Sequence, residues 1–129
     1  MILSDSLVIG LDFGTDSARA ILIDAETGKN LALSARLYTL WKQGLYCEPG
    51  LFQFRHHPLD YLNAMEYVVK DILRMVPGAG KKVRAIGLAA TGSTPVAVDG
   101  EGTPLAMKPA FSDYPNAMFV LWKDQDRKS

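Results

Sequence analysis

The chain has 129 residues, of which 48% are hydrophobic and 22% charged, and 14 Lys and Arg residues balance 14 Asp and Glu residues. This composition is that of an ordinary globular protein and excludes an intrinsically disordered chain. A net charge of zero argues against a nucleic-acid partner, because binding to a phosphate backbone requires a surplus of Lys and Arg.

Cysteine content and hydropathy predict a cytoplasmic protein without a membrane partner. Cys47 is the only cysteine, so neither an internal disulfide nor a zinc site with paired thiolates can form. No basic stretch precedes the first apolar residues, and the apolar runs are shorter than the ~18 residues of a membrane span. The length predicts one domain around one core.

The first 38 residues predict three strands of an antiparallel meander. Residues 7–13 form a short apolar run with β-branched members, and residues 17–24 alternate in polarity after a tight turn. Residues 26–29 include Gly28, which supplies the positive φ of a hairpin turn. Residues 30–38 alternate again and complete the meander.

The following residues predict one long helix and several shorter elements. Residues 41–57 contain turn residues and no sustained period, which indicates an ordered loop. Pro58 suits the first position of a helix that ends before Pro77, because apolar residues recur every three or four positions between them. Strand-like runs follow at 83–90, at 95–98 with a hairpin return at 103–105, and at 118–122. The fold class is therefore α/β: a mixed sheet that begins with the meander and continues through a helix crossover.

The turn after the first predicted strand carries residues suited to phosphate binding. Gly14 lets the backbone approach a ligand closely, and Thr15 and Ser17 supply hydroxyl donors. Asp12 would hold Mg²⁺ through water rather than contact phosphate, because two anions repel. Taken alone, the pattern fits equally well a plain hairpin in which Gly14 only forms the turn.

Four stretches in order along the chain resemble a known family. Residues 9–24 resemble the first phosphate motif of the actin-like ATPase superfamily. The resemblance narrows to the amino-terminal part of the ribulokinase branch of the FGGY carbohydrate kinase family on three further stretches: residues 46–49 with 53–61, residues 91–96 and residues 116–124. One such stretch would be weak evidence, but four in the same order are specific.

The resemblance implies an RNase H-like (actin-like ATPase) domain and an ATP-dependent sugar kinase. The implied reaction is phosphorylation of a ketopentose, with L-ribulose at O5 as the first candidate, in a cleft between two domains. Asp12 would order Mg²⁺, Gly14, Thr15 and Ser17 would cradle the phosphates, and Arg19 would reach the γ-phosphate. ATP and Mg²⁺ are the implied cofactors and a small sugar the implied partner, and the oligomeric state, a homo-oligomer included, is left open.

Two further groups match positions that line the sugar pocket in the family. The first group is Gly92, Ser93 and Thr94, in which the glycine leaves room for a carbon chain and the two hydroxyls can bond sugar hydroxyls. The second group is Trp122, Lys123 and Asp124, in which the ring can pack on a sugar and the charged groups can bond its hydroxyls. Without the resemblance, the first three residues would be a strand-to-turn junction with no ligand. The others would be a buried Trp followed by a solvated charge run at 124–128. His56 and His57 are expected at the surface or in hydrogen bonds, because neighbouring strand residues cannot easily share a metal.

The sequence departs from the family pattern at two positions and contains no match for the catalytic base. Ala89 stands where family members commonly have an acidic residue, and Gln125 stands where ribulokinases tend to have His. No Asp matches the catalytic base, which is expected beyond residue 129. Residues 1–129 are thus expected to be the amino-terminal part of the first kinase domain, without the second domain and inactive alone. The alternatives are a kinase for xylulose or glycerol, or a non-catalytic actin-like ATP-binding module.

Overall fold

The structure, a computed structural model, describes residues 3–125, and these form two compact units. Unit 1 contains the residues up to 37 and residues 63–90, and unit 2 contains residues 38–62 and the residues from 91 onward. The chain length predicts a single core, whereas each unit has a buried hydrophobic cluster of its own. The second cluster exists because the loop-rich residues outside the sheet pack on one another.

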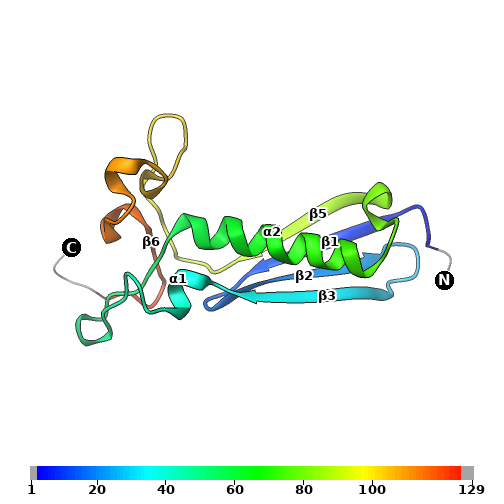
Figure 1. Cartoon of the computed structure of the whole chain (residues 1–129), viewed down its shortest axis with the longest axis horizontal. Coiled ribbons are helices and arrows are strands. Elements are labelled where there is room, and N and C mark those ends of the chain that lie inside the picture. Colours follow the sequence, from blue (N-terminus) through cyan, green and yellow to red (C-terminus); the bar gives the residue numbers. More distant parts are fainter. Residues whose placement is uncertain (1–2, 126–129) are drawn as a thin grey trace. The chain divides into compact units, whose positions relative to one another are not determined.

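Unit 1 is built on a four-stranded mixed sheet with the order β3-β2-β1-β5 (Figure 1). Strands β1 (Leu7–Phe13), β2 (Ser17–Asp24) and β3 (Asn30–Leu37) form the antiparallel meander. Strand β5 (Val83–Ala90) lies parallel to β1 at the edge. The predicted mixed sheet is confirmed, and the bounds of β1, β2 and β5 match the predicted ones.

The alternation of polarity in β2 explains which face of the sheet is buried. Ala18, Ala20 and Leu22 are buried on one side, while Arg19 between them is exposed. Gly28 turns the chain from β2 to β3 with φ +75°, as predicted.

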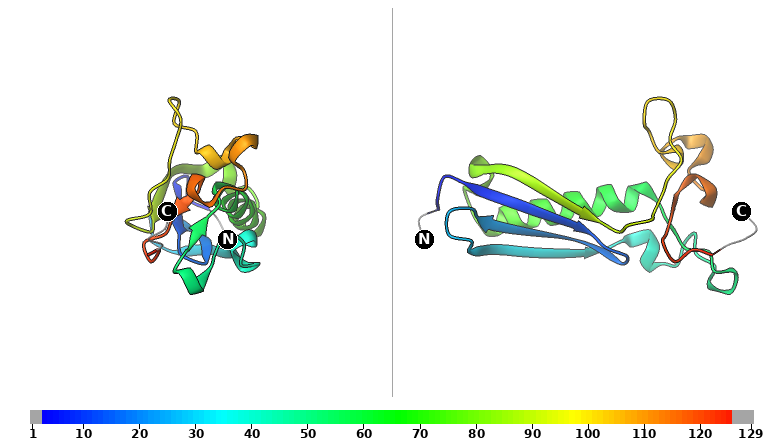
Figure 2. Two further views of the ribbon diagram at one scale, coloured as in Figure 1. Left: turned by 90° about the vertical axis from the view of Figure 1, so that its left-hand side faces the viewer. Right: turned by 180° about the vertical axis from the view of Figure 1, so that it is seen from behind.

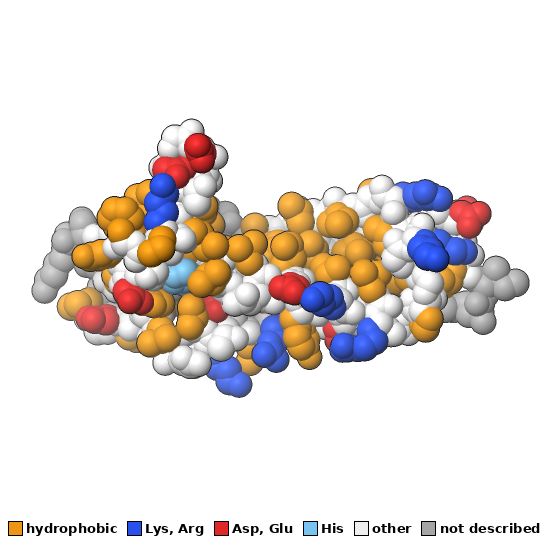
Figure 3. Space-filling view, turned by 45° about the horizontal axis from the view of Figure 1, so that its top comes forward, with side chains coloured by type: hydrophobic (Ala, Val, Ile, Leu, Met, Phe, Trp, Pro, Cys, Tyr) orange, Lys and Arg blue, Asp and Glu red, His pale blue; other side chains and the backbone are white. Residues whose placement is uncertain are grey.

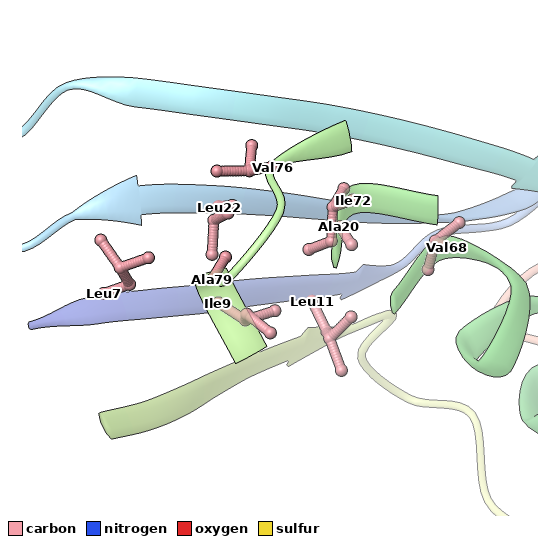
Figure 4. Packing of buried hydrophobic residues seen from close by; sticks show 9 residues of the cluster. All are labelled: Leu7, Ile9, Leu11, Ala20, Leu22, Val68, Ile72, Val76 and Ala79. Carbon is pink, nitrogen blue, oxygen red and sulfur yellow. The ribbon is translucent and has the colours of Figure 1, made fainter. Parts of the chain in front are cut away.

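Helix α2 (Pro58–Met75) begins at Pro58 as predicted and covers this buried face with its residues from 63 onward (Figure 2, right). Val68, Ile72 and Val76 point toward the sheet in Figure 4. The Ser34 hydroxyl on β3 donates to Asp71 Oδ2 on α2 at 2.7 Å, and this bond lowers the pKa of Asp71. The core of unit 1 combines these residues with strand residues and one from the turn after α2: Leu7, Ile9, Leu11, Ala20, Leu22 and Ala79.

The edge strand β5 is poorly covered by the described residues. Ile86 is 55% and Leu88 is 72% exposed. Hydrophobic side chains accordingly gather on the surface over α2 and β5 (Figure 3). A single helix is too narrow to cover a four-stranded sheet, so part of the sheet remains open.

Unit 2 consists mainly of turns joined by short elements. It contains helix α1 (Thr39–Lys42) and the antiparallel pair β4 (Arg55–His56) and β6 (Phe119–Val120). The predicted strand at 118–122 is thus reduced to two residues, and the predicted loop at 41–57 contains the end of α1 and the whole of β4. Residues 95–98 form no strand but one isolated bridge, Val98 to Pro104. Single 3₁₀ turns occupy Pro49–Leu51, Leu105–Met107, Pro109–Phe111 and Pro115–Ala117, and a further one, Ala79–Lys82, follows α2 in unit 1.

The two histidines are buried in unit 2, not exposed, and both are hydrogen-bonded. His56 Nδ1 lies 2.6 Å from the hydroxyl of Tyr61, whose pKa is raised by burial. The Leu59 N–H donates to His57 Nδ1 at 3.1 Å, so Nε2 carries the proton and donates to the Ser112 carbonyl oxygen at 3.0 Å. Of the two expected alternatives, surface exposure or a hydrogen-bonding role, the structure shows the second for both histidines.

Across residues 3–125, the helices are too short or too polar to span a bilayer.

Candidate functional site

The turn between β1 and β2 places the predicted phosphate-binding residues in unit 1. The Gly14 N–H donates to the Ser17 carbonyl oxygen at 2.9 Å and closes the turn. A Cβ at Gly14 would lie 3.3 Å from that same oxygen, which is closer than ordinary van der Waals contact. A side chain at position 14 would make the Ser17 carbonyl oxygen shift by a few tenths of an ångström, so glycine suits this tight turn. The hydroxyl-bearing residues Thr15 and Ser17 lie in this turn, and both are partly exposed.

Asp12 and Arg19 lie opposite each other on β1 and β2, and both are exposed. On its other side Asp12 is paired with Ala89 of β5. Among the described residues, no ion pair joins Asp12 to Arg19. A carboxylate and a guanidinium therefore stand side by side at the end of the sheet, next to the turn.

An open hollow of about 440 Å³ lies beside this pair in unit 1. Gly10 of β1 and Gly87 of β5 face each other across the strands and line it together with Asp12 and Arg19. The space over Gly87 is open, whereas the Ile21 side chain lies over Gly10, with its Cγ2 3.0 Å from the place of a Cβ. Asp12 is thus not turned into the core, and there is open space in front of it.

The donor set around Asp12 fits a metal ion that arrives on a ligand. Among residues 3–125 there is no group of three or more His, Cys, Asp or Glu side chains placed to hold an ion. Two exposed carboxylates lie at this end of the sheet, Asp12 on β1 and Asp16 in the turn that follows. Mg²⁺ binds through one or two carboxylates together with water and substrate phosphates, a mode that exposed carboxylates can provide.

The predicted sugar-side residues Gly92, Ser93 and Thr94 form a bend in unit 2 that follows β5. Thr94 Oγ1 donates to the Gly92 carbonyl oxygen at 2.9 Å, and Thr91 Oγ1 donates to Thr94 Oγ1 at 3.2 Å. Ser93 has φ +51°, a left-handed conformation that is uncommon outside glycine. A Cβ at Gly92 would meet no atom within 4 Å, so the space beside it is open.

The second sugar-side group, Trp122 to Asp124, lies on a turn of unit 2 linked to this bend. The Val120 N–H donates to the Pro95 carbonyl oxygen at 2.9 Å, which joins the two segments. Trp122 is 56% exposed. Lys123 Nζ lies 4.7 Å from the ring centroid of Phe54 and 5.2 Å from that of Trp41.

Asp124 is buried rather than part of a solvated charge run. Its side chain is 3% exposed, and Oδ2 accepts hydrogen bonds from Arg55 Nε at 2.7 Å and from the Phe54 N–H at 2.8 Å. This placement favours an anchoring role over direct contact with a ligand. The expectation of a solvated run is wrong for Asp124, and residues 126–128 of that run lie outside the described residues.

Sequence reasoning missed Arg55 and Asn116, which support this turn. Arg55 is 1% exposed, and its Nη1 donates to Asn116 Oδ1 at 2.8 Å. The sequence shows Arg55 only as an arginine inside a stretch rich in aromatic residues and histidines. Nothing in that stretch indicates that its partner, Asp124, lies 69 positions away. The structure thus gathers the five phosphate-side residues in unit 1 and the six sugar-side residues in unit 2.

Comparison with known proteins shows what the chain is similar to. No protein-family model matches it. The curated ribulokinase of Vibrio parahaemolyticus is 52% identical over 118 residues, which make up 91% of this chain and 21% of that relative. The chain therefore spans about a fifth of the length of the curated relative that it matches.

Solved structures with the same fold are sugar and polyol kinases. A xylulose kinase from Brucella ovis matches with a TM-score of 0.72 at 19% identity, covering 92% of this chain and 21% of that one. A glycerol kinase from Plasmodium falciparum, solved with ADP, matches with a TM-score of 0.67 at 15% identity, covering 97% of this chain and 22% of that one. The expected fold is confirmed: the chain folds like part of a sugar kinase of the actin-like ATPase type.

Proposed function

We propose that this chain contributes the phosphate-binding turn and part of the sugar pocket of a ribulokinase, an enzyme that transfers phosphate from ATP to O5 of L-ribulose. The observation that carries the proposal is the 52% identity over 118 residues to the Vibrio parahaemolyticus ribulokinase. The chain would be the amino-terminal part of the first kinase domain of a cytoplasmic enzyme. Its role is to bind and orient the two substrates.

On the nucleotide side, the proposal uses the turn of unit 1. Gly14 allows the turn to close tightly, so that its backbone N–H groups and the hydroxyls of Thr15 and Ser17 can donate to phosphate oxygens. Arg19 adds a positive charge for the γ-phosphate, since its guanidinium is exposed and always ionised. The hollow beside Asp12 and Arg19 leaves space next to both side chains, and the rest of its lining consists of glycines and aliphatic residues.

Asp12 would hold the Mg²⁺ ion that accompanies ATP through the ion's bound water. When bound, this ion neutralises charge on the phosphate oxygens. The exposed carboxylate of Asp12 fits such a role, because Mg²⁺ is commonly held by one or two carboxylates together with water and substrate phosphates. The catalytic base is assigned to no residue of this chain, so these residues act by position and charge.

On the sugar side, the proposal uses the bend and the turn of unit 2. Gly92 leaves open space for a carbon chain, and the hydroxyls of Ser93 and Thr94 can exchange hydrogen bonds with sugar hydroxyls. Trp122 offers an exposed ring to the apolar face of a sugar. Lys123 and Asp124 complete this group, with Asp124 acting through its burial against Arg55.

A different acceptor, xylulose or glycerol, is the second candidate. The same fold is found in a xylulose kinase and in a glycerol kinase, so the fold itself is compatible with several acceptors. Ala89 at the position next to Asp12 also removes a charge that the family pattern would lead one to expect.

The proposal is tested with a hybrid kinase, in which this chain replaces the matching segment of the Vibrio parahaemolyticus ribulokinase. We expect ATP-dependent ADP release with L-ribulose above that with xylulose or glycerol, and no turnover by the 129-residue chain alone. A hybrid that is folded, as judged by circular dichroism and a cooperative thermal transition, but inactive on every acceptor would contradict the proposal. Higher activity on xylulose or glycerol would select the second candidate.

A further inference from the structure

The turn that carries Trp122 and Lys123 is held at both ends by one other segment of unit 2. The Leu121 N–H donates to the Phe54 carbonyl oxygen at 3.1 Å, and the Gln125 N–H donates to the Phe52 carbonyl oxygen at 2.8 Å. The turn is closed by the Asp124 N–H, which donates to the Leu121 carbonyl oxygen at 2.9 Å. The position of the turn therefore depends on residues 52–56.

Arg55 is the buried side chain that ties this segment to the turn. Its Nε donates to Asp124 Oδ2 at 2.7 Å and its Nη1 donates to Asn116 Oδ1 at 2.8 Å. The side chains of Arg55 and Asp124 are 1% and 3% exposed. A buried charge that loses its partner is strongly unfavourable, so the pair favours this one arrangement of the turn.

The same segment also holds the side chain of Lys123. Its ammonium lies over the rings of Phe54 and Trp41, at distances that allow a cation–π interaction. Lys123 is thereby drawn toward the Arg55 segment, whereas Trp122 of the same turn is 56% exposed.

We propose that Arg55 is a positioning residue for sugar recognition, which acts through Asp124 to fix the Trp122–Lys123 turn. This inference rests on the proposed function, because it takes Trp122 to face the sugar. It separates the roles within the predicted group: Asp124 is the anchor, and Trp122 is the contact. Arg55 itself would not touch the substrate.

A lysine at position 55 tests the inference without removing the charge. Lysine has no planar fork, so it cannot bond Asp124 and Asn116 together in the way that Arg55 does. In the hybrid kinase we expect Arg55→Lys to raise the KM for L-ribulose roughly 10-fold, because small misplacements of a positioning group are costly. The KM for ATP should stay within about twofold, since the change leaves the phosphate turn of unit 1 untouched.

Two further variants keep the result interpretable. Asn116→Ala retains the ion pair and removes only the second bond of Arg55, so we expect a smaller rise in the KM for L-ribulose. If the Arg55→Lys variant fails to fold, the KM of the Asn116→Ala variant for L-ribulose tests the inference in its place. Arg36→Lys is the matched control, because Arg36 is exposed, lies in unit 1 and stacks on Tyr67 at 4.5 Å from the ring centroid. It should leave both KM values unchanged.

A second readout does not depend on the reaction. In the 129-residue chain carrying Trp41→Phe, Trp122 is the only tryptophan, and its fluorescence anisotropy decay reports the mobility of the turn. Arg55→Lys should add a fast component to that decay, and Arg36→Lys should not. Folded Arg55→Lys and Asn116→Ala variants with an unchanged KM for L-ribulose and unchanged anisotropy would overturn the inference. An unmodified hybrid without activity would refute the proposed function and with it the role of Arg55 in sugar recognition. The anisotropy decay would still decide separately whether Arg55 fixes the turn.

Discussion

Asp12 on β1 lies directly opposite Arg19 on β2, and the two exposed side chains border the hollow lined by Gly10 and Gly87. The register of the hairpin produces this pairing, because the tight turn at Gly14 brings both residues to the same end of the sheet. An acidic and a basic group held side by side suit a metal-nucleotide tail, which carries both negative oxygens and a cation.

Gly92 should control the space available to the sugar. Gly92→Val adds a side chain where a Cβ would meet nothing within 4 Å, so the protein should fold as before. In the hybrid kinase we expect the KM for L-ribulose to rise roughly 10-fold, because the added side chain enters the pocket. Steady-state kinetics at saturating ATP provide the measurement.

Gly100→Val is the matched control for this substitution. Gly100 also lies in a loop of unit 2, a Cβ added to it would meet nothing within 4 Å, and it is assigned no role in binding. Its KM for L-ribulose should equal that of the unchanged hybrid. Equal KM values for the Gly92 and Gly100 variants would remove Gly92 from the pocket.

Asp99 should make the hairpin loop of unit 2 sensitive to acid. Its hydrogen bond to Lys108, together with the N–H groups of Thr103 and Glu101, lowers the pKa of Asp99 to about 2. The pKa of an Asp in an unfolded chain is about 3.9. The contribution of Asp99 to the free energy of unfolding is therefore complete above that pH and is lost as the pH falls toward 2. NMR titration of the Asp99 carboxyl carbon checks the value. Lys108→Met should raise this pKa, and an unchanged value would exclude Lys108 as the main cause.

Ile72 should be essential to the core of unit 1. It is 0% exposed and points from α2 toward the sheet (Figure 4). Ile72→Ala should lower the free energy of unfolding by about 2–5 kcal/mol, because it leaves a cavity in a close-packed cluster. Met75→Ala at the end of the same helix is the control, since Met75 is 51% exposed, and it should cost less than about 0.5 kcal/mol. Similar losses in urea unfolding of both variants would contradict the packing described for α2.

The sheet and the long helix were predictable because their signals are local. Each of these signals is contained in a short stretch of sequence. They are the alternating polarity of β2, the glycine at position 28 that takes a positive φ, and the helical period between Pro58 and Pro77. The crossover helix predicted a mixed sheet, because it allows a later strand to run parallel to an earlier one, but the pairing of that strand with β1 was not predicted. The phosphate-side residues could be nominated for the same reason, because all five lie within eight consecutive positions.

Unit 2 was much less predictable because its structure depends on contacts between distant residues. Arg55 forms an ion pair with Asp124, 69 positions later in the sequence, and no period or motif in either segment predicts this contact. The apolar run at 95–98 suggested a strand, yet Pro95 has no N–H to donate and only Val98 forms a bridge. Burial of His56 likewise depends on the rings of Tyr38, Trp41 and Tyr61, which gather around it only in the folded chain.

The most direct test of the phosphate assignment compares Asp12→Ala with Asp5→Ala in the hybrid kinase. Asp5 is the matched carboxylate, because its side chain is 86% exposed and it has no assigned role in binding. We expect Asp12→Ala to lower kcat with L-ribulose by roughly 100-fold or more while the KM for L-ribulose changes less than about threefold. Asp5→Ala should leave both values unchanged. A folded Asp12→Ala hybrid that keeps its kcat would contradict the assignment of the β1–β2 turn to the nucleotide phosphates.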